Sequence, residues 1–192
     1  MSTRLSEDSG RITVLRISDN YFVGVTLPDE LKNTIESARM WMRERWGNRS
    51  GMRTEAHITL VPPFYSEKPL SEIRRILSGI TVPEVSVHVS GWGAFGERTI
   101  FAHVERSREL ETLQKEIALR LRSAGITLKN EKRFVPHITV ANRDIRPESF
   151  VPSMEYLGNI DLDCTFPVDS FMIFTFDRFW SSEEKARVRF SS

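Results

Sequence analysis

The sequence predicts one α+β domain built from two similar lobes. Segments with the period-two alternation of strands interchange with segments that have the 3.6-residue period of helices. A four-residue pattern, His-Ile-Thr followed by an aliphatic residue, occurs once in each half of the chain, at His57 and at His137. No low-complexity linker separates the halves. We therefore expect a single bilobal domain over residues 11–192, after a flexible polar leader at residues 1–10.

The expected strands are rich in β-branched and aromatic residues. Glu84–Ser90 alternates most clearly between apolar and polar residues. Pro62 and Pro63 are expected to end one strand, and the glycine-rich stretch Gly91–Gly96 is expected to turn the chain into a hairpin. The predicted strands are Arg11–Ile17, Tyr21–Leu27, Glu55–Val61, Glu84–Ser90, Arg98–Val104, Pro136–Asn142, Asp161–Phe166, Ser170–Phe176 and Ala186–Phe190.

The expected helices carry apolar residues at helical spacing between recognisable ends. Pro28 suits a first helical residue, acidic side chains follow it, and Gly47 ends that helix. Gly125 stands where the C-terminal cap of another helix is expected. The predicted helices are Pro28–Trp46, Pro69–Ser78, Ser107–Ala124 and Pro147–Leu157.

Composition excludes several classes of protein. No run of 18 apolar residues and no apolar signal region occur, and a single cysteine excludes a disulfide framework, so we expect a cytoplasmic protein without a membrane span. The net charge of +1 excludes a global basic field for coating nucleic acid. Positive charge is local, with five arginines against one glutamate in Arg39–Arg53 and seven basic against two acidic residues in Arg120–Arg146. Such patches suit a small anion or a short phosphate-bearing strand.

The repeated tetrapeptide is the most informative feature of the sequence. In a strand, side chains alternate between two faces, so each histidine shares a face with the threonine two residues later. This pairs His57 with Thr59 and His137 with Thr139, while the aliphatic residues point to the core. If a pseudo-twofold axis relates the lobes, the two polar faces meet across a cleft.

Two imidazoles and two hydroxyls around one small volume suit phosphate-ester chemistry. A neutral imidazole takes a proton from the attacking oxygen, and a charged one gives a proton to the leaving oxygen. The hydroxyls can hydrogen-bond the non-bridging phosphate oxygens as negative charge develops there. These groups need no metal or cofactor to perform the reaction.

The paired motif resembles that of the two-histidine (2H) phosphoesterase superfamily, in its bacterial 2'-5' RNA ligase-like, RNA 2',3'-cyclic phosphodiesterase branch. The flanks agree, because Phe134 and Pro136 precede His137 as they often do in that family. The resemblance implies that each lobe is an antiparallel sheet with outer helices and that the active cleft lies between the lobes. It also implies opening of 2',3'-cyclic phosphates, on RNA ends or small nucleotides, to 2'-phosphomonoesters. RNA ligation would be the reverse reaction.

Other residues are candidates for holding substrate. Phe64 and Phe134 suit stacking on a base or ribose, or equally core packing beside a strand end. Arg133 and Arg143 suit contact with an outer phosphate, or a solvated surface. No catalytic role is expected for the remaining histidines, and Cys164 is expected to be a buried thiol.

Three alternatives stay open at this point. Two histidines with threonines make a poor zinc site, and no carboxylate recurs beside both motifs, since Glu55 precedes His57 where Val135 precedes His137. A non-catalytic RNA- or nucleotide-binding module would use the same scaffold without turnover. A purely structural interaction protein has no heptad or repeat to support it. We expect a monomer.

Overall fold

The structure, a computed structural model, describes residues 20–128, 133–175 and 185–191. The predicted leader and the strand expected at Arg11–Ile17 lie outside these residues. The described strands are β1 (Tyr21–Thr26), β2 (His57–Phe64), β3 (Val85–Phe95), β4 (Thr99–Val104), β5 (His137–Asn142), β6 (Asp163–Val168), β7 (Ser170–Thr175) and β8 (Lys185–Arg189). The described helices are α1 (Asp29–Trp46), the 3₁₀ turn η1 (Ser50–Arg53), α2 (Leu70–Leu77), α3 (Arg108–Ser123) and α4 (Pro147–Gly158).

The eight strands form one antiparallel sheet in the order β6-β3-β4-β5-β2-β1-β7-β8. The predicted α+β class is confirmed. The two strands that carry the repeated tetrapeptide, β2 and β5, are neighbours at the centre and share the single register pair Ile58–Ile138. Four strands lie on each side of this junction, and the unit β1-α1-β2-α2 in one half corresponds to β4-α3-β5-α4 in the other.

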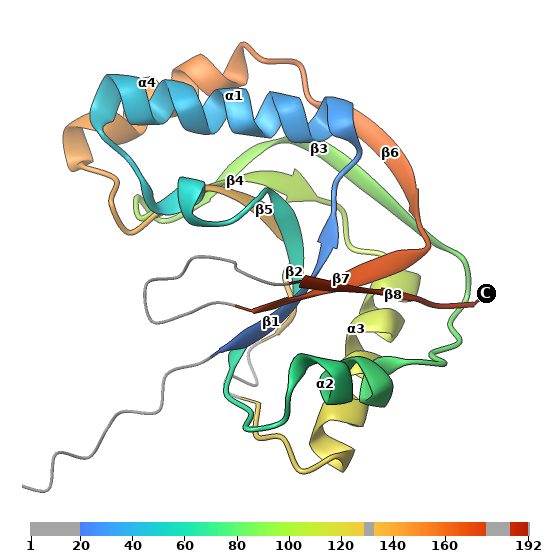
Figure 1. Ribbon diagram of the computed structural model, residues 1–192. Helices are drawn as coiled ribbons and strands as arrows, with labels where there is room; N and C mark the ends of the chain where they lie inside the picture. The colour runs from blue at the N-terminus through green and yellow to red at the C-terminus, as the bar shows by residue number, and fades with distance from the viewer. Residues whose placement is uncertain (1–19, 129–132, 176–184, 192) are drawn as a thin grey trace, which may run out of the picture.

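The helices pack in two pairs around the sheet. Helices α1 and α4 lie beside each other at one end, and α2 and α3 at the other (Figure 1). Helix α1 starts after Pro28 and ends at Gly47, whose φ of +78° closes the helix in the left-handed conformation that glycine adopts readily. Ser107 caps the start of α3, because its hydroxyl accepts a hydrogen bond from the Leu110 backbone. The described helices include none with the length and apolar character needed to cross a bilayer.

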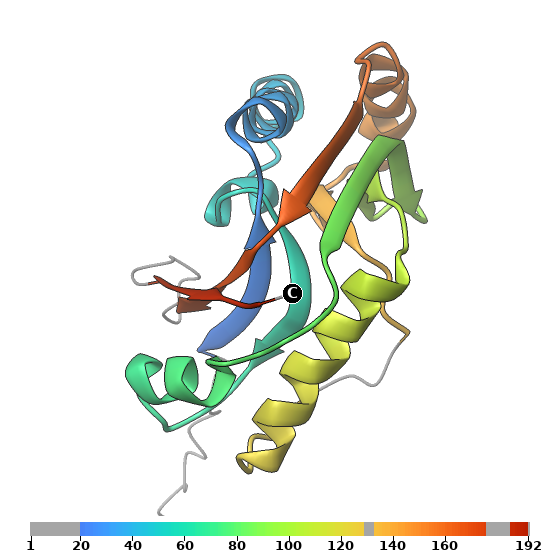
Figure 2. The same ribbon diagram turned by 90° about the vertical axis from the view of Figure 1, so that its right-hand side faces the viewer.

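The hydrophobic core occupies the aliphatic face of the strands. Ile58 and Ile138 are fully buried in this core, which α2 and α3 cover. Figure 2 shows α3 running along the twisted sheet. A second cluster joins α1 and α4 to β4 and β5 through residues such as Met42 and Leu157. The opposite face of β2 and β5 is therefore left to the polar residues of the two tetrapeptides.

Two expected boundaries are wrong. Strand β2 continues through Pro62 and Pro63, which lie in an irregularity of the β1–β2 ladder where the register shifts, and there a missing backbone N–H is tolerated. Strand β3 continues through Gly91 to Phe95, because Gly91, at φ +67°, forms a bulge against β4 instead of a turn. The hairpin turn follows at Gly96, also with positive φ.

Candidate active site

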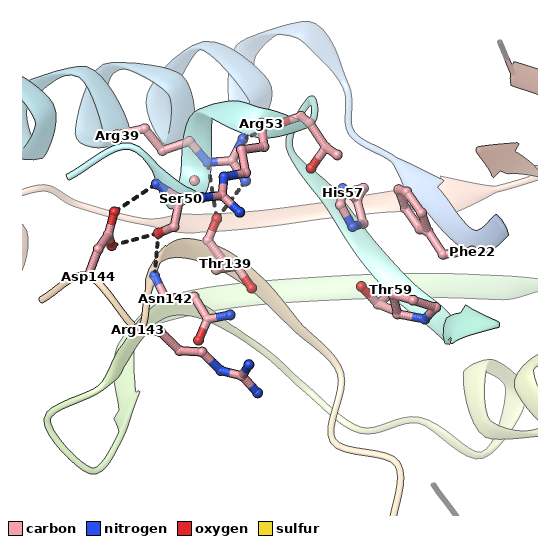
Figure 3. A pocket seen from close by; sticks show the side chains of 13 residues that line it. Phe22, Arg39, Ser50, Arg53, His57, Thr59, Thr139, Asn142, Arg143 and Asp144 are labelled. Carbon is pink, nitrogen blue, oxygen red and sulfur yellow. Dashed lines mark hydrogen bonds between the residues drawn. The ribbon is translucent and has the colours of Figure 1, made fainter. Parts of the chain in front are cut away.

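The two tetrapeptides converge at the centre of the sheet. Because Ile58 pairs with Ile138 between antiparallel strands, the residues flanking each isoleucine lie around this pair on the opposite face. His57, Thr59, His137 and Thr139 are all half-buried there, while their aliphatic neighbours are buried on the other face. The four side chains thus lie on one face of the two central strands. Three of them, His57, Thr59 and Thr139, line one cavity (Figure 3), whereas His137 is not among its lining residues.

Both imidazoles are held by the same backbone contact. His57 Nδ1 lies 2.7 Å from the carbonyl oxygen of Glu55, and His137 Nδ1 lies 2.8 Å from that of Val135. A carbonyl only accepts hydrogen bonds, so Nδ1 carries the hydrogen in both rings. Each neutral imidazole therefore keeps Nε2 as a proton acceptor for a bound molecule.

Burial favours the neutral form of both histidines. Burial lowers the pKa of His57 to about 4; the positive charges of Arg39 and His137 add to the shift, and the Glu55 carbonyl opposes it. Burial also lowers the pKa of His137, against the hydrogen bond to the Val135 carbonyl. An anion placed between the rings would raise both pKa values, so the site favours a negatively charged ligand.

A cavity of about 500 Å³ opens where β2 and β5 diverge beyond their one shared pair (Figure 3). The turn η1 fills part of this gap, and Gly51 passes so close to β5 that a Cβ there would lie 2.0 Å from the Val140 carbonyl oxygen. This volume is in the range of small-ligand sites. The lining residues are Phe22, Arg39, Ser50, Gly51, Arg53, Thr54, His57, Thr59, Pro63, Thr139, Asn142, Arg143 and Asp144.

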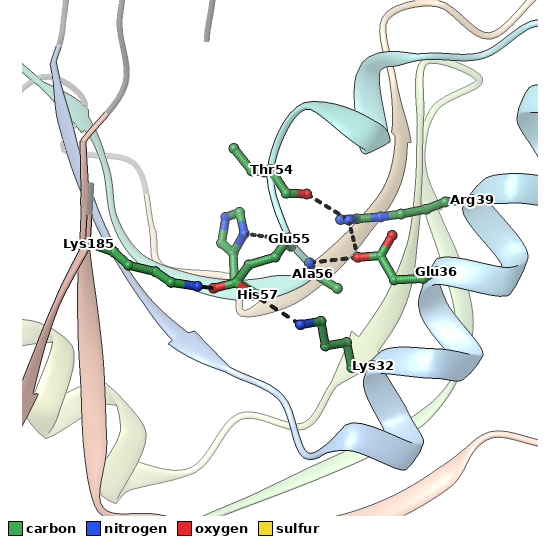
Figure 4. A network of polar contacts seen from close by, with 8 residues as sticks. All are labelled: Lys32, Glu36, Arg39, Thr54, Glu55, Ala56, His57 and Lys185. Carbon is green, nitrogen blue, oxygen red and sulfur yellow. Dashed lines mark hydrogen bonds and ion pairs between the residues drawn. The ribbon is translucent and has the colours of Figure 1, made fainter. Parts of the chain in front are cut away.

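Arg39 joins the two halves of the site from helix α1. Its guanidinium donates to the Thr139 carbonyl through Nε and Nη2, at 3.1 and 2.6 Å, and to the Thr54 carbonyl through Nη1 at 3.0 Å. Nη1 also pairs with Glu36, whose Oε1 accepts from the Ala56 backbone as well (Figure 4). Arg39 is buried, so its donors take the place of the strand pairing that β5 loses where it leaves β2.

The segment before His57 is fixed by a second group of charges. The Glu55 carboxylate pairs with Lys185 at 2.9 Å and with Lys32 at 3.4 Å (Figure 4). Burial works against the carboxylate, but hydrogen bonds and charge from the two lysines outweigh it and lower the pKa of Glu55. These ion pairs hold the residue whose carbonyl orients His57.

The far wall of the cavity is held by Asp144. Its carboxylate accepts hydrogen bonds from the backbone N–H groups of Arg49 and Ser50 and from the Ser50 hydroxyl, at 2.7–2.8 Å. These contacts dock η1 against the end of β5. Arg143, just before Asp144, has a φ of +69°, which is unusual for a residue with a side chain, and its N–H donates to the Arg98 carbonyl. Arg53 and Arg143 are exposed and line opposite walls (Figure 3).

The other predicted binding residues fall in different surroundings. Phe64 is fully buried in the core, with its ring centroid 5.8 Å from that of Tyr21, so it has no surface to offer a base and the core interpretation is the correct one. Phe134 is half-buried against the main core. Arg133 is exposed and does not line the cavity, whereas Arg143 does.

Sequence reasoning missed the aromatic residues around the histidines. The His57 ring lies 4.8 and 5.4 Å from the rings of Phe22 and Phe174, on the neighbouring strands β1 and β7. The His137 ring lies 5.3 and 5.1 Å from those of Phe101 and Phe95, on β4 and β3. The structural duplication therefore extends beyond the tetrapeptides, but only the strand order reveals it.

Gly24 and His103 are two further residues that the sequence alone does not place at the site. A Cβ on Gly24 would lie 2.9 Å from the Ile58 carbonyl oxygen and 3.2 Å from His57 Cδ2, so glycine leaves room for the imidazole. His103 lies opposite His137 in the β4–β5 register, and its side chain is exposed. Among the residues described, no group of three or more His, Cys, Asp or Glu side chains is arranged to hold a metal ion.

The duplicated halves, with paired His-x-Thr strands at the centre of one sheet, are consistent with the two-histidine phosphoesterase superfamily. The chain belongs to the 2'-5' RNA ligase superfamily, whose family model matches residues 27–178. A comparison with curated proteins finds no match.

Solved structures with the same fold span nearly the whole chain. LigT from E. coli is 16% identical, with a TM-score of 0.62 over 91% of this chain and 98% of LigT. TT0787 from Thermus thermophilus is 20% identical, with a TM-score of 0.61 over 90% of this chain and all of that protein. The PDE domain of MHV ns2 is more distant, at 13% identity and a TM-score of 0.52 over 82% of this chain and 99% of that domain. At these identities the likeness is one of fold.

Proposed function

We propose that this protein is a phosphodiesterase that opens 2',3'-cyclic phosphates of RNA ends or nucleotides to 2'-phosphomonoesters, with His57 and His137 as acid and base. The observation that carries the proposal is the meeting of both His-x-Thr pairs on one face, each imidazole with Nδ1 on a carbonyl and Nε2 available. Thr59 and Thr139 are the proposed ligands of the non-bridging phosphate oxygens. The family supports a phosphoesterase or RNA ligase type of enzyme.

The reaction needs two proton transfers and one displacement at phosphorus. The neutral imidazole takes a proton from water at Nε2 as the water oxygen bonds to phosphorus. The bond between phosphorus and the 3'-oxygen breaks on the opposite side, and the protonated imidazole gives its Nε2 proton to that oxygen. The product keeps phosphate on the 2'-oxygen. If a 5'-hydroxyl attacks phosphorus in place of water, the same two proton transfers break the bond to the 3'-oxygen and give a 2'-5' linkage, which is ligation.

The basic residues are proposed to hold the rest of the substrate. Arg143 and Arg53, on opposite walls of the cavity, suit a further phosphate, and Arg133 with Phe134 suits RNA that extends beyond the cleft. Solved structures of E. coli LigT include complexes with 3'-AMP, ATP and NADP+. These complexes support a nucleotide or RNA end as the substrate class. We further propose that the protein acts as a cytoplasmic monomer without a metal or cofactor.

A product assay tests the proposal. The purified protein is incubated with the four nucleoside 2',3'-cyclic phosphates and with cyclic-phosphate-ended oligonucleotides, and chromatography separates 2'- from 3'-phosphates. We expect 2'-phosphates, at a rate unchanged by EDTA. Saturable binding without product would instead favour a nucleotide-binding module, and loss of activity in EDTA would favour a metal site.

The pH profile of kcat/KM is expected to be bell-shaped, with its maximum between about pH 4 and pH 6.5. This parameter reports the free enzyme, in which the pKa of His57 is about 4 and that of His137 lies below 6.5. One imidazole must be neutral and the other charged. Activity therefore falls above this range, where both rings are neutral, and below it, where both rings are protonated. The profile of kcat should lie at higher pH, because bound phosphate stabilises the imidazolium. A kcat/KM that is flat from pH 5 to 8 would contradict the paired roles.

A further inference from the structure

One aromatic ring beside the histidines is exposed. Phe95, the last residue of β3, is 44% exposed, although its ring centroid lies only 5.1 Å from that of His137, at an interplanar angle of 90°. Its ring also packs on Phe101, with centroids 4.4 Å apart and planes at 35°. Single exposed apolar residues are common on protein surfaces, and Phe95 is one of several here, but it is the one whose ring contacts a candidate catalytic histidine.

The backbone around Phe95 fixes the position of its ring. A Cβ on Gly93 would lie 2.7 Å from Phe101 Cε2, so the absence of a side chain at Gly93 lets the Phe101 ring lie across β3. Phe95 then packs against that ring, and the chain turns directly afterwards at Gly96. The Phe95 ring is therefore held by a packed partner on one side, while its remaining surface faces solvent beside His137.

The corresponding rings at the other histidine have no such surface. Phe22 and Phe174 are stacked on each other, with centroids 4.4 Å apart and planes only 3° apart, and the His57 ring packs against both. Their exposures are 3% and 0%. Phe22 lines the cavity, but mostly with a packed ring, and Phe101 is 6% exposed. Of the four phenylalanines around the two imidazoles, Phe95 is by far the most exposed.

We infer that Phe95 is the stacking surface for the nucleobase of the substrate. The inference rests on the proposed function, because it assumes a nucleotide whose cyclic phosphate lies between His57 and His137. A ribose joins phosphate and base within one nucleotide, so a phosphate at His137 brings the base to the adjacent ring. Stacking is tolerant of base identity, because every base has a π-face. The site is therefore expected to accept all four bases and to distinguish nucleotides from base-free cyclic phosphates.

The experiment compares substrates with and without a base. Adenosine 2',3'-cyclic phosphate and methyl riboside 2,3-cyclic phosphate are given to the wild type and to Phe95→Ala, Phe95→Leu and Phe95→Trp. Phe95→Leu keeps an apolar cover over Phe101 without an aromatic face, which guards against a loss of folding in the alanine variant. Leu119→Ala on α3 is the matched control, since Leu119 is an exposed apolar residue that, unlike Phe95, does not lie on a strand beside His137.

We expect Phe95→Ala and Phe95→Leu to lower kcat/KM for the adenosine substrate about 10- to 100-fold, mainly through KM, and to leave the methyl riboside substrate within about twofold. Phe95→Trp and Leu119→Ala should stay near the wild type on both. Equal losses on both substrates would overturn the inference by showing that Phe95 only supports His137, and so would no loss on either. A wild type that hydrolyses neither substrate would instead overturn the proposed function itself, and this inference with it.

Discussion

His57→Ala and His137→Ala are each expected to lower kcat on a 2',3'-cyclic phosphate at least about 100-fold, because each removes one of the two proton transfers. The fold should persist, since both side chains lie on the polar face of the sheet and not in the core between strands and helices. The measurement is steady-state kinetics at the pH optimum, with circular dichroism and thermal unfolding to verify the fold.

The double variant sharpens this test. If the two imidazoles act as a unit on one phosphate, removing both should cost little more than the worse single change, because the residual rate then comes from binding and from the threonine hydroxyls. His88→Gln is the matched control, since this histidine lies away from the cavity and pairs with Glu105 and Asp163. Near-normal activity in both single variants, or full additivity in the double variant, would contradict the assignment.

The catalytic candidates were predictable because their pattern is local. The period-two alternation of a strand already separates His57 and Thr59 from Ile58, and repetition at His137 indicates a shared site. The ends of α1 were also predictable. Proline is favoured at the start of a helix and glycine just after its end, and the structure places Pro28 and Gly47 at those two positions.

What the sequence did not reveal depends on long-range pairing. Phe22 lies in a predicted strand and Phe95 in the stretch that was expected to turn the chain, and only the strand pairings of the folded sheet bring each ring beside a histidine. Phe64 shows the converse: its place beside a motif suggested substrate contact, but the register puts it against Tyr21 in the core. Gly91 was expected to turn the chain, but it forms a bulge. Glycine with a positive φ is typical of both structures, so its presence in the sequence does not distinguish them.

Arg39 was missed for a related reason. In sequence it is one of five arginines in Arg39–Arg53, and nothing local distinguishes it from the exposed members of that patch. Its place in the fold is set by the divergence of β2 and β5, which leaves the Thr139 carbonyl without a strand partner. A buried arginine with three acceptors in reach replaces the missing backbone donors.

Arg39→Met is expected to lower the free energy of unfolding by about 3 kcal/mol, because it leaves the Thr139 and Thr54 carbonyls and the Glu36 carboxylate without their donor. Arg39→Lys should recover only part of this loss, since an ammonium group does not reproduce the planar fork of donors. Urea unfolding measures the effect. The control is Arg43→Met, an exposed arginine one turn later on α1, which should change the free energy of unfolding by less than about 0.5 kcal/mol.

A second readout separates this positioning role from simple stabilisation. The positive charge of Arg39 helps to lower the pKa of His57, so its removal in Arg39→Met should raise that pKa and move the acid limb of the kcat/KM profile to higher pH. Arg39→Lys keeps the charge and should leave the limb near its wild-type position, although its stability is reduced. An Arg39→Met variant with wild-type stability would show that the two carbonyls find other donors. Loss of stability with an unmoved acid limb would show that Arg39 supports the fold without influencing the charge state of His57.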